Sequence, residues 1–212
     1  MFSVEKVLNG KLLEYCYLAH DDKEKKCICI DPGYNTESIM KYIDDRNLVV
    51  DTILLTHSHF DHILSCKSLQ DKFSSKIYIS KEDEKTLYDA DNNYATLIHQ
   101  YTFDKFNITA NVHDGEHLNV LGYDIECIST PGHTFGGFSF YIESEKTLFS
   151  GDTLFKDTFG RIDLYGGNFE AINNSIIHKL FLLPDDTIVY PGHGEMTSIG
   201  YEKENNEILR GE

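Results

Sequence analysis

The chain has 212 residues, 41% of them apolar, and a formal net charge of −16. This length and composition suit one compact globular domain or two small ones. The strong negative charge argues against a nucleic-acid partner and against anionic membrane surfaces, because both would repel it.

The sequence shows no basic start followed by an apolar run, and no stretch that approaches the roughly 18 apolar residues of a membrane helix. Its five cysteines are odd in number and contain no Cys-x-x-Cys pair. We interpret them as reduced, mostly buried thiols, which are typical of a reducing compartment. The expected location is therefore the cytoplasm.

Strands and helices alternate along most of the predicted structure. Before residue 90, the pattern predicts strands at 4–8, 14–20 and 27–31, a helix at 36–47, a strand at 52–56, a helix at 62–73, a strand at 77–80 and a helix at 81–89. After residue 116, it predicts two pairs of strands, at 118–121 with 123–129 and at 138–142 with 146–150. A helix at 169–182, a strand at 187–190 and a terminal helix complete the predicted elements. Residues 90–116 give no clear pattern. This order predicts a layered α/β protein with two sheets sandwiched between helices.

A dense cluster of polar residues directly follows the expected strand at 52–56. It contains His57, His59, Asp61 and His62 within six positions. In an extended segment, residues two apart project to the same side, so His57 and His59 can bind one ion. Asp61 and His62 lie where the chain is expected to turn into a helix, and they can reach a second ion. Buried histidines and an acid this close together favour a metal site over ordinary packing.

Two ions need more ligands than this segment supplies, and three residues in similar settings are candidates. His133, Asp152 and His193 each follow a glycine just past an apolar, strand-like run. Glycine lets the backbone turn sharply and approach a ligand closely, and sites in open α/β sheets gather at the carboxyl ends of strands. Asp152 is the best placed of these residues to bridge two ions.

Imidazole and carboxylate ligands without thiolate suit zinc, iron or manganese. The remaining histidines are expected to be surface or packing residues: His20, His99, His113, His117 and His178.

The motifs taken together resemble those of the metallo-β-lactamase superfamily, most closely its glyoxalase II-like (hydroxyacylglutathione hydrolase-like) branch. They are His57-x-His59-x-Asp61-His62, Thr-Pro-Gly-His133-Thr, Ser-Gly-Asp152-Thr-Leu-Phe and Tyr-Pro-Gly-His193-Gly. The resemblance covers about residues 10–209 and implies a four-layer αβ/βα sandwich with mixed sheets. It also implies one domain over 1–212, similar to the short hydrolases that lack a C-terminal helical glutathione-binding region.

The resemblance also implies roles for the seven ligands. The first metal would take His57, His59 and His133, the second would take Asp61, His62 and His193, and Asp152 would bridge. The expected cofactors are two divalent ions, zinc first, with iron or manganese as alternatives. Such a pair lowers the pKa of a shared water toward 7, and Asp61 can orient that water as a catalytic residue.

The implied activity is hydrolysis of a small-molecule acyl thioester by a hydroxide that bridges the metals. A thiol is a good leaving group, which fits a sequence with no obvious dedicated general acid. The alternative within the same superfamily is a persulfide dioxygenase with one iron on His57, His133 and Asp152. A third, non-enzymatic interpretation is a metal-buffering or interaction module on the same scaffold.

Some positions near the expected site depart from the family pattern or admit two interpretations. No cysteine occurs in the ligand set, which lowers the expectation of antibiotic hydrolysis, and Phe135 stands where the family usually has proline. Arg161 is a candidate clamp for a substrate carboxylate, as the family's basic residue at this spacing suggests. It is equally a candidate for an ordinary surface ion pair with Asp157 or Asp163.

Overall fold

A computed structural model describes residues 1–10, 12–21, 25–99 and 104–211. The chain divides into two compact units, Met1–Asn111 and Val112–Glu212. The expected single domain over 1–212 stays a prediction. Among the described residues, no helix has the length and apolar character needed to cross a membrane.

The first unit is built on a mixed six-stranded sheet in the order β1-β2-β3-β4-β5-β6. Its strands are β1 (Phe2–Asn9), β2 (Glu14–Asp21), β3 (Lys26–Ile30), β4 (Val49–Leu54), β5 (Lys76–Ser80) and β6 (Ala110–Val112). β1 to β3 are antiparallel neighbours, whereas β3, β4 and β5 run parallel. The parallel strands therefore end at the same edge of the sheet.

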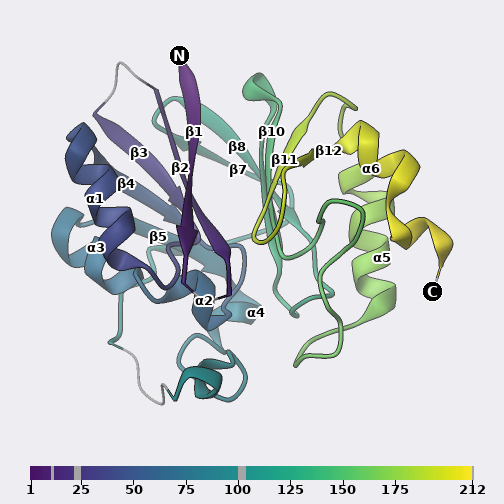
Figure 1. The fold of residues 1–212 in the computed structure, drawn as a ribbon, viewed down its shortest axis with the longest axis horizontal. Coiled ribbons are helices and arrows are strands. Elements are labelled where there is room, and N and C mark those ends of the chain that lie inside the picture. The colour runs from purple at the N-terminus through teal and green to yellow at the C-terminus, as the bar shows by residue number, and fades with distance from the viewer. Residues whose placement is uncertain (11, 22–24, 100–103, 212) are drawn as a thin grey trace. The chain divides into compact units, whose positions relative to one another are not determined.

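The helices of the first unit pack on this sheet through apolar residues. They are α1 (Thr36–Arg46), α2 (Phe60–Ile63), α3 (Cys66–Phe73), α4 (Lys81–Glu84) and the 3-10 turn η1 (Ala95–Ile98). Ile39 and Ile43 of α1 and Leu69 of α3 are fully buried in one core cluster with Ile53 of β4. Figure 1 shows α1 and α3 beside these strands. The apolar spacing that predicted the helix at 36–47 thus marks its buried face.

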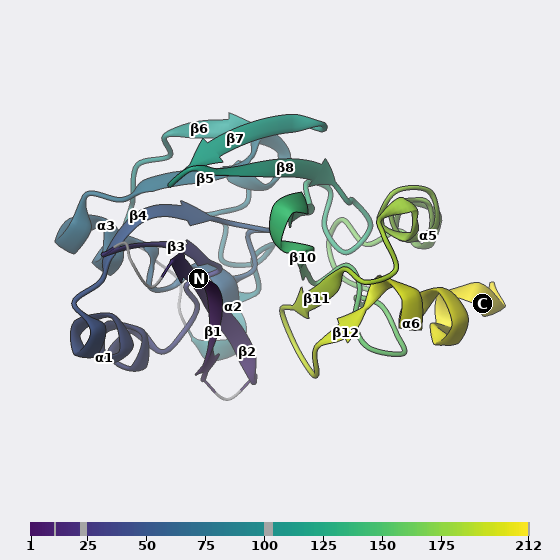
Figure 2. The ribbon, with the colours of Figure 1, turned by 90° about the horizontal axis from the view of Figure 1, so that it is seen from above.

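The second unit contains the other mixed six-stranded sheet, in the order β12-β11-β10-β9-β8-β7. Its elements are β7 (Glu116–Val120), β8 (Tyr123–Ser129), β9 (Phe138–Ile142), η2 (Glu143–Glu145), β10 (Thr147–Gly151), α5 (Phe169–His178), η3 (Leu180–Leu182), β11 (Ile188–Pro191), β12 (Thr197–Ser198), α6 (Ile199–Asn205) and η4 (Glu207–Arg210). Figure 2 shows α6 next to β11 and β12. Ile172 and Ile176 of α5 and Ile199 of α6 share a core cluster with Leu148 and Val189 of the strands.

Several predicted elements have different bounds, and tertiary contacts explain the clearest case. The helix predicted at 62–73 is two helices, α2 and α3, with a break at Ser65. The Ser65 backbone N–H donates to Pro32 O (2.9 Å) and its hydroxyl to Gly33 O (2.6 Å), so this residue binds the loop after β3 instead of continuing α2. Such long-range bonds are not visible in a local apolar pattern.

The other differences are at helix ends and in short elements. The helix predicted at 81–89 is α4 alone, because the following turns use bonds such as Asp89 N–H to Thr86 O. The helix predicted at 169–182 ends at His178 and is followed by η3. β6, β12 and η1 were not predicted.

All five cysteines are free and buried, as predicted. Burial raises the pKa of Cys127 to about 12 and also raises that of Cys66. A thiol with a raised pKa is a poor nucleophile and a poor metal ligand at neutral pH.

Replacement of Ile53 by alanine tests the core of the first unit. Ile53 pairs with Cys29 and Ile77 on both neighbouring strands and is fully buried. We expect Ile53→Ala to lower the free energy of unfolding by about 2–5 kcal/mol, because it removes buried methyl groups and leaves a cavity. Val49→Ala in the same strand, at a position that is 40% exposed, should change it by less than about 0.5 kcal/mol in the same denaturant titration.

Candidate metal centre

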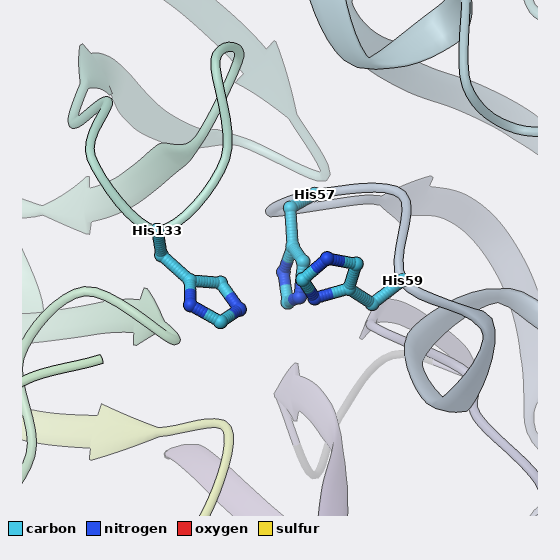
Figure 3. A group of neighbouring side chains, drawn as sticks. All are labelled: His57, His59 and His133. Atoms are coloured by element: carbon cyan, nitrogen blue, oxygen red, sulfur yellow. The ribbon is translucent and has the colours of Figure 1, made fainter. Parts of the chain in front are cut away.

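The segment that follows β4 carries the histidine cluster. His57, His59 and His62 are buried, and so is Asp61. His57 and His59 lie in the extended stretch before α2, and their rings meet edge to face with centroids 4.7 Å apart (Figure 3). α2 begins at Phe60, so Asp61 and His62 lie on its first turn. The chain thus changes from an extended to a helical conformation inside the motif, as its spacing predicted.

A carboxylate from the neighbouring strand end organises this cluster. Asp31 directly follows β3, and its Oδ1 accepts the backbone N–H of Thr56 (2.8 Å). Its Oδ2 accepts the Thr56 hydroxyl (2.6 Å) and lies 3.0 Å from Nδ1 of His62. Asp31, His57 and His62 have ligand-type atoms within 4.8 Å of one another. Because both Asp31 oxygens already accept hydrogen bonds, we interpret Asp31 as a support for the ligands.

These contacts determine which ring nitrogen of each histidine carries the proton. A carboxylate only accepts, so Nδ1 of His62 donates to Asp31. The Thr56 hydroxyl donates its hydrogen to Asp31. In the 3.0 Å contact between Thr56 Oγ1 and His57 Nδ1, the donor is therefore the Nδ1–H of His57. Both histidines are therefore left with a lone pair on Nε2, which is the form that binds a metal.

Asp61 and His62 form a second pair of donor groups in the same unit. Asp61 Oδ2 lies 3.9 Å from Nε2 of His62. The position of Asp61 is restricted by Gly33, where an added Cβ would come within 1.8 Å of the Asp61 carbonyl oxygen. Close packing of these two backbone segments therefore requires glycine at position 33.

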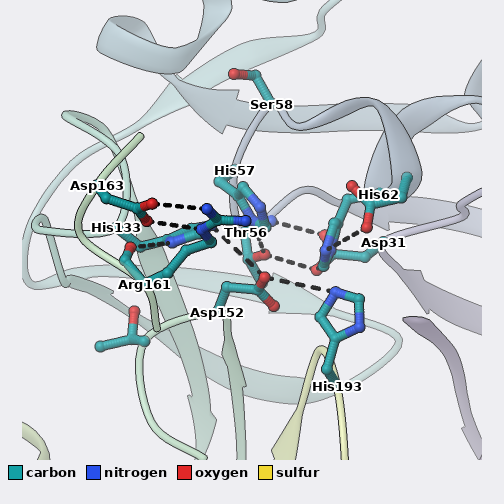
Figure 4. A network of polar contacts seen from close by, with 12 residues as sticks. Asp31, Thr56, His57, Ser58, His62, His133, Asp152, Arg161, Asp163 and His193 are labelled. Atoms are coloured by element: carbon teal, nitrogen blue, oxygen red, sulfur yellow. Dashed lines mark hydrogen bonds and ion pairs between the residues drawn. The ribbon is translucent and has the colours of Figure 1, made fainter. Parts of the chain in front are cut away.

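In the second unit, three strand ends deliver His133, Asp152 and His193 to one place. β10 and β11 are parallel neighbours that end at Gly151 and Pro191, and β8 runs in the same direction because β9 is antiparallel to both β8 and β10. Asp152 Oδ2 lies 3.5 Å from Nε2 of His133 and 3.5 Å from Nε2 of His193. Figure 4 shows His193 directed at this carboxylate. An acid between two imidazoles in this way is suited to bridge two ions.

His133 is fixed in the same tautomer as the histidines of the first unit. Its Nδ1 lies 2.8 Å from the carbonyl oxygen of Arg161, which can only accept, so the lone pair is again on Nε2. Gly160 lies against the Asp152 backbone, where an added Cβ would be 1.8 Å from the carbonyl oxygen. The segment after Asp152 therefore folds back closely over both ligands.

The Arg161 side chain forms a surface ion pair. Its Nε and Nη2 each donate to the Asp163 carboxylate at 2.7 Å, and both side chains are largely exposed. The guanidinium lowers the pKa of Asp163 to about 2. Of the two interpretations made from the sequence, the ion pair with Asp163 is present, and the role of Arg161 as a substrate clamp stays a prediction.

A buried acid of α6 supports the loops on both sides of the second-unit ligands. Glu202 is fully buried and accepts hydrogen bonds from Asp157 N–H (3.0 Å), Asn206 Nδ2 (2.7 Å) and the Thr197 hydroxyl. Asn206 Nδ2 also donates to Phe155 O and Thr158 O. These bonds tie the segment after Asp152 and the segment after His193 to one helix.

Asp31 and Glu202 are the two supporting residues that the sequence analysis missed. Asp31 had a usable signal, because Ile30-Asp31-Pro32-Gly33 repeats the apolar, turn-forming setting of the predicted ligands. It also adopts a left-handed conformation (φ 49°) that few residues other than glycine, asparagine and aspartate tolerate. Glu202 had no signal, since a single acid in an amphipathic helix usually faces solvent.

Comparison with known proteins decides the family. The family model described as "Metallo-beta-lactamase superfamily" matches residues 9–193. The chain belongs to the metallo-β-lactamase superfamily. The predicted superfamily and α/β fold with two mixed sheets are therefore confirmed.

Curated relatives are identical to this chain at about a third of the aligned positions. "Hydroxyacylglutathione hydrolase GloC" of Haemophilus influenzae is 36% identical over 200 residues, which cover 92% of this chain and 92% of the relative. "Probable metallo-hydrolase YqgX" of Bacillus subtilis is 35% identical over 201 residues, covering 92% of this chain and 91% of the relative.

Solved structures of the same fold match nearly the whole chain. The "BLEG-1 B3 metallo-beta-lactamase" has a TM-score of 0.93 at 31% identity and covers 98% of this chain and 99% of its own. TTHA1623 "in a di-iron-bound form" has a TM-score of 0.86 at 30% identity, with 97% and 100% covered. ETHE1 from Myxococcus xanthus has a TM-score of 0.81 at 25% identity, with 99% and 85% covered.

These findings identify a metal-dependent hydrolase of this superfamily. The described residues fit resident metal ions on their own chemistry, because three histidines have Nδ1 fixed as a donor and present Nε2. The histidine and aspartate cluster suits a site for two ions, as in this superfamily.

Asp31→Asn tests the support of the first-unit ligands. Asparagine tolerates the left-handed backbone but has one acceptor oxygen where Asp31 uses two, so His57 and His62 should lose their fixed tautomer. We expect metal affinity to fall about 10–100-fold, measured by competition with a chromogenic chelator. Asp45→Asn, on the exposed face of α1, is the matched control and should bind metal as the wild type does.

Glu202→Gln tests the support of the second-unit ligands. Glutamine replaces the carboxylate by a neutral amide, and hydrogen bonds to a carboxylate are stronger than bonds to a neutral acceptor, so the free energy of unfolding should fall by about 1–3 kcal/mol. Denaturant titration measures this, with Glu204→Gln, an exposed position on the same helix, as the control. Equal stability of the two variants would contradict the role assigned to Glu202.

Proposed function

We propose that this protein hydrolyses acyl thioesters of small thiols with two divalent metal ions, zinc first. The seven proposed ligands are His57, His59, Asp61, His62, His133, Asp152 and His193. Within each unit these residues lie together, and membership of the superfamily supports joining the two sets in one centre. The single observation that carries the metal proposal is the fixed orientation of three imidazoles.

The choice of thioesters rests on the relative GloC, which is named a hydroxyacylglutathione hydrolase. Its sequence is 36% identical to this one over an alignment that covers 92% of each chain. In the reaction, water adds to the acyl carbon, the C–S bond breaks, and a carboxylic acid and a thiol are released. When bound, two divalent ions supply Lewis-acid polarisation and lower the pKa of a shared water.

The side chains of this protein would orient the attacking water, and the leaving thiol would need little help from a proton donor. Asp61, held in place by Gly33 and beside His62, would accept a hydrogen bond from the attacking water and fix its direction. The departing thiol has an ordinary pKa of about 8.5, so it leaves as a thiolate with little need of a proton donor. No serine or cysteine nucleophile is required.

A second candidate rests on the closeness of His133 and Asp152, whose Nε2 and Oδ2 atoms are 3.5 Å apart. With His57, these two residues would bind one iron in a persulfide dioxygenase. This reaction consumes oxygen, whereas thioester hydrolysis does not, so an oxygen electrode separates the two.

Metal analysis and a substrate panel test the proposal together. Freshly purified protein is analysed for zinc, iron and manganese and assayed with S-lactoylglutathione, a chromogenic β-lactam, and glutathione persulfide with an oxygen electrode. We expect two equivalents of zinc and release of free thiol from the thioester. One equivalent of iron with oxygen uptake would overturn the proposal in favour of the second candidate, and β-lactam turnover alone would also overturn it.

Asp152→Asn links this activity to the proposed bridge. The amide has one acceptor oxygen in place of two and carries no charge, so both metal sites should weaken. We expect thiol release to fall by at least about 100-fold and the metal content to drop below two equivalents. Asp186→Asn, an exposed acid of the same unit, should retain both. Full activity of Asp152→Asn would contradict the bridging role.

A further inference from the structure

The first unit contains a cavity of about 430 Å³ beside the histidine cluster. Its wall comes from four separate parts of the chain: the described residues between β1 and β2, the loop after β3, the start of α2, and η1 with the residue after it. It is lined by Gly10, Leu12, Tyr34, Phe60, Asp61, Leu97, Ile98 and His99. This volume lies within the range of about 300–1,000 Å³ that is typical of small-molecule sites.

Most of the wall is hydrocarbon, and much of it faces solvent. Leu97 is 72% exposed, Tyr34 52% and Leu12 51%. Three large apolar side chains exposed around one cavity are unfavourable in water unless something apolar covers them. They come from different segments of the chain, so the fold brings them together.

The one carboxylate in this wall is Asp61, the residue proposed to orient the attacking water. Phe60 precedes it on α2, and Gly33, next to Tyr34, packs on its carbonyl oxygen. The apolar wall is therefore connected on both sides to the backbone that positions Asp61. A group bound in the cavity would therefore lie beside the side chain that is proposed to orient the attacking water.

We propose that this cavity binds the acyl chain of the substrate and that the enzyme prefers thioesters of apolar acids. This inference rests on the proposed thioester hydrolysis and adds the substrate class. The thiol half of a glutathione thioester carries carboxylates and amides, and the hydrocarbon that makes up most of this wall would not solvate them. An unbranched or aromatic acyl chain meets no such penalty.

A series of thioesters on one thiol tests the preference. S-propionyl- and S-hexanoylglutathione differ only by three methylenes, and each methylene that enters the cavity should raise kcat/KM about fourfold. We expect S-hexanoylglutathione to exceed S-propionylglutathione by roughly 50-fold. Equal kcat/KM values for the two would overturn the proposal.

Two leucine variants locate the effect in the cavity. Leu97→Asp places a charge in the wall and should reduce the hexanoyl-to-propionyl ratio by about tenfold or more. Leu182→Asp changes a leucine of similar exposure, 77%, in the second unit, and should leave the ratio unchanged. An equal ratio in the two variants would overturn the assignment.

A binding measurement separates this inference from the hydrolase proposal. Hexanamide, a neutral mimic of the acyl chain that is not a thioester, is titrated into the metal-loaded protein by calorimetry or NMR. Binding to wild type and Leu182→Asp, with loss in Leu97→Asp, supports the cavity even if no thioester is turned over. Turnover of S-lactoylglutathione without hexanamide binding overturns the cavity proposal and leaves thioester hydrolysis standing.

Discussion

The hydrogen bonds of the Asp31 carboxylate are the interaction on which the orientation of His57 and His62 depends. The carboxylate accepts two hydrogen bonds from Thr56 and one from His62, and through the Thr56 hydroxyl it also sets His57. Without it, buried imidazoles a few ångströms apart would have no reason to prefer the tautomer that presents Nε2. A left-handed aspartate at a strand end is an uncommon conformation, and this network is what stabilises it here.

In the second unit, His133 has the same tautomer, but its Nδ1–H has a different kind of acceptor. The acceptor is the backbone carbonyl of Arg161 and not a carboxylate. This places a constraint on the segment after Asp152, because it must fold back over the ligands closely enough for Gly160 to contact the Asp152 backbone. Glu202 and Asn206 hold the far side of that segment. Arg161 thus orients His133 through its backbone carbonyl. A sequence motif for a basic side chain does not reveal such a contact.

The sequence contained enough information for the parts of the fold and site that repeat a local pattern. The ligands after β4, β8, β10 and β11 share a glycine or strand-end setting, and the apolar spacing of α1 marks its buried face. The break at Ser65 was not predictable, because it depends on hydrogen bonds to Pro32 and Gly33 more than 30 positions away. Glu202 was missed for the same reason, since only tertiary structure shows that its side chain is buried.

Charge explains why the apolar cavity, more than Arg161, is expected to select the substrate. The chain carries a net charge of −16, so anionic substrates approach against an unfavourable field. The charge of Arg161 is already neutralised by Asp163. An exposed ion pair of this kind contributes little to stability, so a substrate carboxylate could replace Asp163 as the partner of Arg161. Binding energy from the acyl chain needs no such exchange. It grows with each methylene that leaves water.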